Sequence, residues 1–173
     1  MSDKERLVRG TVTASHGEQK LRTLQVLLQA YEPRDNLEHI EPYGFTSEPH
    51  CDKSTDALVG FLDDTRSLGF VINVADRRYR ITKMKSGEVA IYDDLKRHIY
   101  FKRDGIEING ADSPITVKTT NSLIAEVGKD ATVTASGNIT LTSNADISIT
   151  AKGTLFLKGG QKTIISSSDL EIN

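Results

Sequence analysis

The chain has 173 residues, a net charge of −2 and 37% hydrophobic residues, enough for one compact domain plus an extension. No apolar run approaches the length of a membrane span, and the charged N-terminus lacks the apolar core of a signal peptide. The single cysteine, Cys51, excludes an internal disulfide and suits synthesis in a reducing cytoplasm, so we expect the protein to be made there in soluble form.

The first hundred residues have the pattern of a small β domain. Alternating polar and apolar residues bounded by Gly and Asp predict strands at 8–15, 21–30, 57–62, 68–75, 78–81, 87–92, 97–101 and 104–108. The segment from Tyr31 to Thr55 contains three prolines and is expected to be a loop. Many short strands without a strong helix predict a small barrel or sandwich, and periodicity alone does not choose between them.

The composition changes at Pro114. Every Arg and every His precedes residue 104, whereas the last 59 residues hold 17 Ser and Thr, five Lys and five acidic residues. This change predicts a domain at 1–105, with short connecting strands to about 114, and a second region at 106–173. A tail of this composition resembles a disordered segment, but its strict aliphatic period argues against disorder.

The tail repeats an apolar-x-apolar pair every eight residues. The pairs lie at 115/117, 123/125, 131/133, 139/141, 147/149 and 155/157, a weaker pair follows at 163/165, and Leu170/Ile172 slips the register by one. Alternation at period 2 predicts one short strand per octad, and a small or polar residue between pairs permits a corner. An ordinary antiparallel meander is the alternative.

A single chain gains too little from this repeat to fold alone. Two aliphatics per octad contribute about 3–6 kcal/mol when fully buried, which is less than the ordering of eight residues costs. A lone coil would also leave open strand edges. Three intertwined chains would place every apolar pair on a shared axis, so the sequence predicts a trimeric β-helix.

Several motifs resemble the Mu-type baseplate assembly proteins, the V or central-spike proteins of contractile-tailed phages. The most specific are Pro-Tyr-Gly-Phe-Thr-Ser at 42–47, Arg-Tyr-Arg at 78–80 and Gly-Glu-Val-Ala-Ile-Tyr at 87–92. The resemblance covers nearly the whole chain, since the octad tail is also a feature of that family. It implies an all-β protein in which an N-terminal OB-fold barrel precedes the trimeric intertwined β-helix.

The resemblance also implies a function. The N-terminal domain would attach to the tail hub, and the needle would puncture the host outer membrane during infection, so we expect a homotrimer in the virion baseplate, made in the host cytoplasm. The alternative is a trimeric cell-surface or receptor-binding tail fibre module, which would need an exposed specificity head. No nucleophile–His–acid grouping or glycine-rich phosphate loop is present, and we expect no enzyme activity and no cofactor.

One departure from the family concerns the tip. Many members end in His-x-His, which holds an iron ion at the apex, but this chain has no His after His98, so we expect no metal there. A trimeric end would expose Leu170 and Ile172 as an apolar patch, which usually marks an interface. We expect a separate PAAR-like tip protein to cap the end formed by Asp169, Leu170, Ile172 and Asn173; a tip that seals itself is the alternative.

The remaining motifs are weak. His50 and Cys51, with His39 and His16, lack the paired ligand spacing of zinc sites. The acid pairs 63–64 and 93–94 lie in turn signals and are interpreted as turn residues.

A basic cluster around an aromatic residue, Arg77, Arg78 and Arg80 with Tyr79, resembles a nucleic-acid contact. The first 114 residues hold 17 Lys and Arg against 19 acidic residues, so no dominant basic field forms. We therefore expect no nucleic-acid partner.

Overall fold

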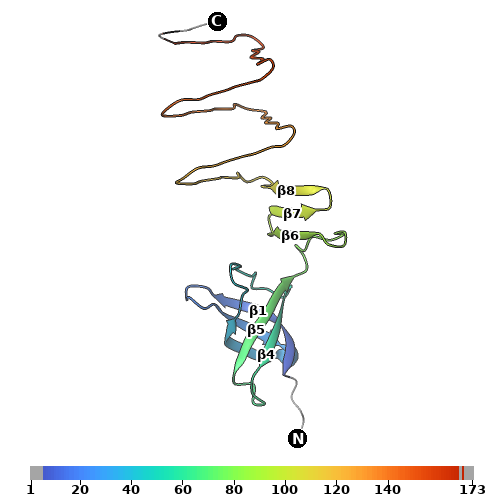
Figure 1. Ribbon diagram of the computed structural model, residues 1–173. Helices are drawn as coiled ribbons and strands as arrows, with labels where there is room; N and C mark the ends of the chain where they lie inside the picture. Colours follow the sequence, from blue (N-terminus) through green and yellow to red (C-terminus); the bar gives the residue numbers. More distant parts are fainter. Residues whose placement is uncertain (1–5, 168, 170–173) are drawn as a thin grey trace. The chain divides into compact units, whose positions relative to one another are not determined.

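The computed structural model describes residues 6–167 and 169 (Figure 1). The chain divides into two compact units, Met1–Lys118 and Thr119–Asn173. Within the described residues, no helical segment has the length and hydropathy that a membrane crossing requires.

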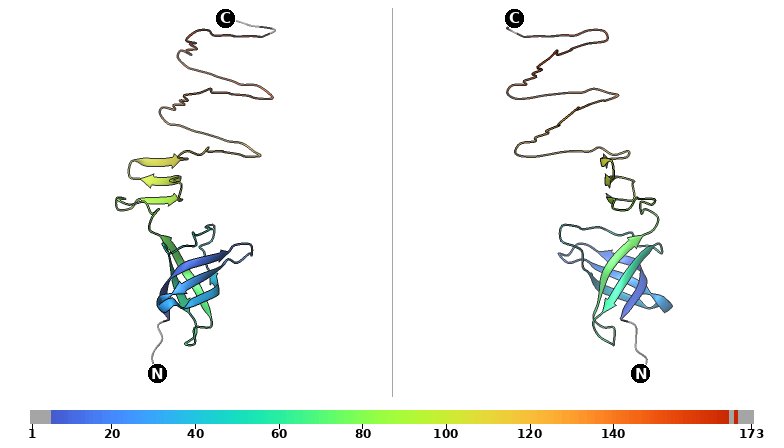
Figure 2. Two further views of the ribbon diagram at one scale, coloured as in Figure 1. Left: turned by 180° about the vertical axis from the view of Figure 1, so that it is seen from behind. Right: turned by 45° about the vertical axis from the view of Figure 1, so that its right-hand side comes forward.

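Five strands of the first unit close into a barrel (Figures 1 and 2). They are β1 (Leu7–His16), β2 (Thr23–Leu28), β3 (Pro33–His39), β4 (Thr55–Phe61) and β5 (Gly69–Asp76). β1 pairs with both β2 and β4, and a short parallel pairing of β3 with β5 completes the order β1-β2-β3-β5-β4. The predicted all-β fold is confirmed, and this barrel is consistent with the predicted OB type.

Alternation along the strands builds the barrel core. In β2, Leu24, Val26 and Leu28 are buried while their neighbours are partly exposed. A register shift between Val12 and Ala14 on β1 bends the ladder, as closing so small a barrel requires. The full core is Val8, Val12, Leu24, Val26, Leu28, Leu37, Ala57, Val59, Phe61 and Val71.

Two strand predictions were wrong. Residues 33–39 form β3, although the prolines of this region predict a loop. Pro33 occupies the first position of the strand, where a missing N–H is tolerated, and only Leu37 and His39 are buried, so the periodic signal is short. Residues 78–81 form no strand, because the backbone N–H of Arg78 donates to Asp76 Oδ1 (2.9 Å) and turns the chain.

Three further strands pair with one another instead of joining the barrel. They are β6 (Val89–Tyr92), β7 (His98–Lys102) and β8 (Gly105–Asn109), which form an antiparallel sheet in the order β6-β7-β8. Gly87, at φ +81°, turns the chain into β6. Asp93 Oδ1 accepts the N–H groups of Leu95 and Arg97 (both 3.0 Å) and thereby organises the β6–β7 turn.

The second unit is an extended chain with bends at a fixed interval. Its described residues form no strand pairing within the chain, and all of their side chains are exposed. Successive passes turn back at these bends (Figures 1 and 2). The bends fall at 120–121, 128–129, 136–137, 144–145, 152–153 and 160–161. This spacing confirms the predicted corner in each octad of the described tail; the intertwined β-helix itself stays a prediction.

Candidate functional site

The sheet β6–β8 has an apolar face made of two registered rows. Val89, Phe101 and Ile106 are cross-strand partners in one row, and Ile91, Ile99 and Ile108 are partners in the other. Their exposed fractions run from 39% for Ile99 to 68% for Ile106. Six large apolar side chains are therefore held side by side on the open surface; a contiguous patch of this kind marks an interface.

The opposite face of the same sheet is polar, yet it is the better covered one. It carries Tyr92, His98, Tyr100 and Glu107, of which all but Tyr92 are half-buried. A soluble sheet normally buries its aliphatic face and exposes its polar one. The sheet β6–β8 shows the reverse of this pattern, because its aliphatic face is the more exposed one.

The apolar face continues into the tail repeat. Ile91, Ile99 and Ile108 line a groove of about 390 Å³ together with Pro114 and Ile115, and Ile115 opens the first octad pair. The three sheet pairs, 89/91, 99/101 and 106/108, have the same apolar-x-apolar form as the octads. The sheet therefore places three pairs of the octad form, at unequal spacings, ahead of the first octad, and they fold as a meander inside one chain.

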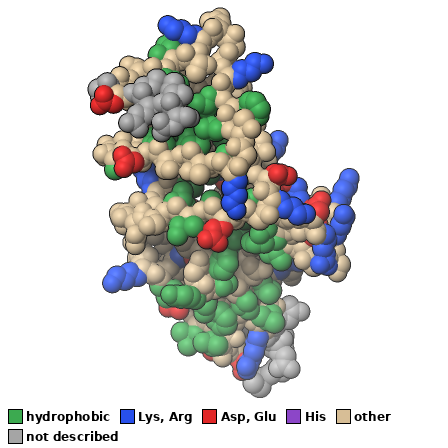
Figure 3. Space-filling model, turned by 45° about the horizontal axis from the view of Figure 1, so that its top comes forward, with side chains coloured by type: hydrophobic (Ala, Val, Ile, Leu, Met, Phe, Trp, Pro, Cys, Tyr) green, Lys and Arg blue, Asp and Glu red, His purple; other side chains and the backbone are tan. Residues whose placement is uncertain are grey.

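The apolar side chains of the octad pairs in the tail are as exposed as those on the apolar face of the sheet. Ile139, Ile147 and Ile149 are 54% to 60% exposed, and Leu141 is 72% exposed. Apolar side chains lie among polar ones on the surface of the space-filling view (Figure 3). Side chains of this size contribute about 1.5–3 kcal/mol each when fully buried, so a single chain leaves much of the available hydrophobic stabilisation unused.

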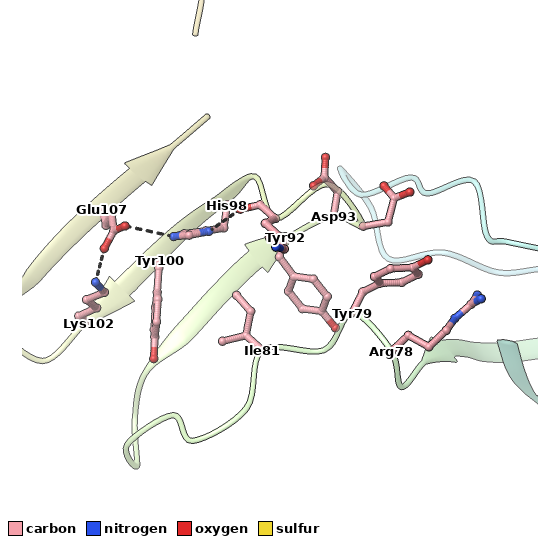
Figure 4. Close-up of a pocket in the computed structure, with 11 residues that line it drawn as sticks. Arg78, Tyr79, Ile81, Tyr92, Asp93, His98, Tyr100, Lys102 and Glu107 are labelled. Carbon is pink, nitrogen blue, oxygen red and sulfur yellow. Dashed lines mark hydrogen bonds and ion pairs between the residues drawn. The ribbon is translucent and has the colours of Figure 1, made fainter. Parts of the chain in front are cut away.

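The polar face is ordered by charged hydrogen bonds (Figure 4). Glu107 lies at their centre and binds Lys102 and, at 3.4 Å, His98 Nε2. Hydrogen bonding from Lys102, first among several causes, lowers the pKa of Glu107 to about 2. The Tyr100 hydroxyl donates to Glu88 (2.6 Å), and this bond raises the pKa of Tyr100.

A second set of charged contacts lies beside the barrel, and one of them, between His50 and Asp94, reaches the β6–β7 turn. Arg78 binds Asp76 (2.5 Å) at the end of β5 and Asp52 (2.9 Å) in the loop before β4. His50 Nε2 lies 3.2 Å from Asp94 in the β6–β7 turn, and its ring stands 5.4 Å from that of Tyr79. Hydrogen bonds from Arg78, the largest cause, lower the pKa of Asp76 to about 2.

These contacts also account for the basic cluster. Arg77 pairs with Asp56 (2.7 Å) and Arg78 with two carboxylates, so both cations are neutralised within the chain. The Arg78 guanidinium lies 5.0 Å from the centre of the Tyr79 ring. Arg77 and Arg78 therefore bind carboxylates of the barrel and of the loop before β4.

The histidines and the cysteine of the weak zinc motif do not come together. His39 is buried in the barrel wall, His16 lies 3.3 Å from Asp35, and Cys51 is exposed beside the loop carbonyl of Pro49. In the described part of the chain, no group of three or more His, Cys, Asp or Glu side chains is arranged to hold a metal ion.

The first member of each acid pair organises a turn, as the sequence predicts. Asp63 accepts the N–H groups of Ser67 (3.2 Å) and Leu68 (2.9 Å) between β4 and β5. Hydrogen bonds from Ser67, with others from Thr65 and Leu68, hold the pKa of Asp63 far below its usual value. Asp93 has the corresponding role between β6 and β7.

The predicted tip contact lies mostly outside the described residues. Of Asp169, Leu170, Ile172 and Asn173, the structure describes only Asp169, whose N–H donates to Ser167 Oγ (3.1 Å). The cap at this end stays a prediction.

Comparison with known proteins adds an independent observation. Residues 9–78, which span most of the barrel, match the family model described as bacteriophage Mu Gp45, N-terminal. The chain is also 32% identical over 99 residues to the baseplate puncturing device gp45 of Escherichia phage Mu. This alignment covers 57% of the chain and 49% of the relative, so the chain spans about half of that protein's length. The resemblance to Mu-type baseplate spike proteins, which the motifs of the sequence predict, is therefore confirmed over 57% of the chain, with the family match on the barrel. Its predicted extension over nearly the whole chain stays a prediction.

Proposed function

We propose that this protein is the central spike of a contractile phage-tail baseplate. Three chains would wind their tails into an intertwined β-helix, with the octad pairs on the common axis. The barrels would attach to the tail hub, and the needle would puncture the host outer membrane. The role is structural and requires no catalysis, cofactor or nucleic acid.

The observation that carries the proposal is the regular exposure of apolar pairs. One pair and one bend recur in each octad between residues 120 and 161, and no side chain of the described tail is covered by its own chain. A needle that must transmit force needs a stiff shaft, and identical chains that share one axis would bury all of these pairs at once. The Mu relative, named a puncturing device, supports the same role.

Light scattering on a sizing column tests the assembly. A stable trimer at micromolar concentration, resistant to heat and detergent, is the expected result. A monomer under these conditions would contradict the proposal, because the shaft cannot form from one chain. A reconstruction of the tail tip would then place the barrel against the hub and the tail toward the cell.

The end of the needle is a separate part of the proposal. We infer that a small PAAR-like protein caps Asp169, Leu170, Ile172 and Asn173. Leu170→Glu should spare the trimer yet release the cap from assembled particles. Particles without density beyond Asn173 would favour a tip that seals itself.

A further inference from the structure

The polar face of β6–β8 borders a cavity that the spike role leaves unused. Its volume is about 570 Å³, within the usual range of small-ligand sites. Three tyrosines, Tyr79, Tyr92 and Tyr100, line it together with His98 and Ile81 (Figure 4). All of its lining residues belong to the first unit, between 78 and 107, so one chain forms it.

The charges around the cavity cancel. Three basic side chains, Arg78, Lys96 and Lys102, face three acidic ones, Asp93, Asp94 and Glu107. Each carboxylate already has a basic partner within the chain: Asp93 binds Arg97 (2.5 Å), Asp94 binds His50 and Glu107 binds Lys102. An anionic ligand would therefore meet three carboxylates as well as three cations and gain no net attraction, and a cationic ligand would compete with existing ion pairs. A lipid chain would leave six charged groups without water.

A second cavity lies beside the first and shares two of its tyrosines. Tyr79 and Tyr92 lie next to each other (Figure 4) and also line a neighbouring cavity of about 660 Å³, bounded by loop residues 46–50. The two cavities are therefore neighbours that share an aromatic wall, and we call them together the groove. A tyrosine offers an apolar ring face and a hydroxyl at the same position.

We propose that this groove binds a neutral glycan built of hexopyranose rings. Such a ligand presents C–H faces that pack on Tyr79 and Tyr92. Its hydroxyl groups can donate to carboxylate oxygens, such as those of Asp94, without breaking the ion pairs, since each oxygen has a further lone pair. Neutral polyols combine these two properties, and they suit a wall that combines aromatic rings with charged side chains of both signs. The proposal is independent of trimer formation.

Two sources supply this chemistry in bacteria: surface polysaccharides and the glycan of the cell wall. Chitotetraose represents the amino-sugar chain of the wall, and a neutral O-polysaccharide fragment released from lipopolysaccharide represents the surface. Calorimetric titration of each probe into the full-length protein, with ligand-observed NMR for weak binding, separates the two. Binding of either probe supports the site, and their relative affinities name the source.

Matched variants locate the binding in the groove. Tyr92→Ala and Tyr79→Ala should each weaken binding about ten-fold or more, as loss of an aromatic platform does. Tyr92→Phe keeps the ring and should retain most of the affinity, and Tyr43→Ala, at a fully exposed tyrosine outside the groove, should change nothing. Circular dichroism and light scattering on every variant check the fold and the oligomeric state.

The outcomes separate this proposal from the spike function. No binding of either probe at millimolar concentration overturns the glycan site, as does undiminished binding by both alanine variants. A protein that binds the probes as a monomer retains the glycan site and loses the trimeric spike.

Discussion

Ile147→Asp is the sharpest test of the shaft. In the isolated chain Ile147 is 54% exposed. Full burial of such a side chain contributes about 1.5–3 kcal/mol, so covering the exposed half would add about 1–1.5 kcal/mol per chain, or about 3–5 kcal/mol for three copies. The variant loses this contribution.

The substitution also introduces a charge. Three carboxylates would meet in a dry core, and an unpaired buried charge destabilises by about 3–5 kcal/mol for each chain. Together the two effects exceed the whole stability of many domains. We therefore expect complete loss of the trimer.

Ser148→Asp is the matched control, since it adds the same charge at the neighbouring position. Period-2 alternation places Ser148 on the outer side of the shaft, where solvent hydrates the carboxylate. Light scattering and detergent-resistance gels should show an intact trimer for Ser148→Asp and none for Ile147→Asp. Equal tolerance of both changes would refute the inward register.

Three other outcomes are expected. Ile108→Asp on the apolar face of β6–β8 should abolish the trimer by light scattering, whereas Asn109→Asp on the other face should not; a trimer of Ile108→Asp would exclude that face from the interface. The pKa of Asp76 is depressed from 3.8 to about 2 in the folded state, so its contribution to stability is present above pH 3.8 and declines as the pH falls towards 2; denaturant titration should show a smaller decline in Asp76→Asn than in the native protein, because Glu107 and Asp63 still contribute to it. A fragment of residues 1–118 should bind spike-less tails in pull-down experiments and residues 119–173 should not; the reverse result would invert the proposed polarity.

Much of the fold follows from local patterns in the sequence. The clean alternation of Leu24, Val26 and Leu28 predicts β2 correctly, and the octad pairs predict the spacing of the bends. Strand β3 was missed because tertiary pairing with β2 and β5 holds a segment whose prolines favour a loop. In this segment the pairing with neighbouring strands outweighs the local preference of the residues for a loop.

The sheet β6–β8 was predicted as strands but not separated from the barrel. The signal was present, because 89/91, 99/101 and 106/108 carry the same pair as the octads at unequal spacings. A search for pairs spaced by exactly eight residues does not find these pairs. The groove beside the polar face had no sequence signal, since Tyr79 and Tyr92 are brought together by the turn after β5.

The meander β6–β8 determines the order in which the parts of the trimer would fold. Its contacts join residues within the short span 89–109, whereas residues 119–167 form no strand pairing within their own chain. Local pairing forms fast, and pairing between chains must wait for encounter. The sheet β6–β8 of each chain would therefore be folded, with its apolar face exposed, before the tail of that chain is ordered. When the apolar faces of three chains associate, the three tails would begin to wind at the same residue. Winding from a common origin would prevent the slippage by one octad that identical repeats otherwise permit. Pulse-labelled hydrogen exchange during refolding should find protection at 89–109 before any in 119–167, and simultaneous protection would contradict this order.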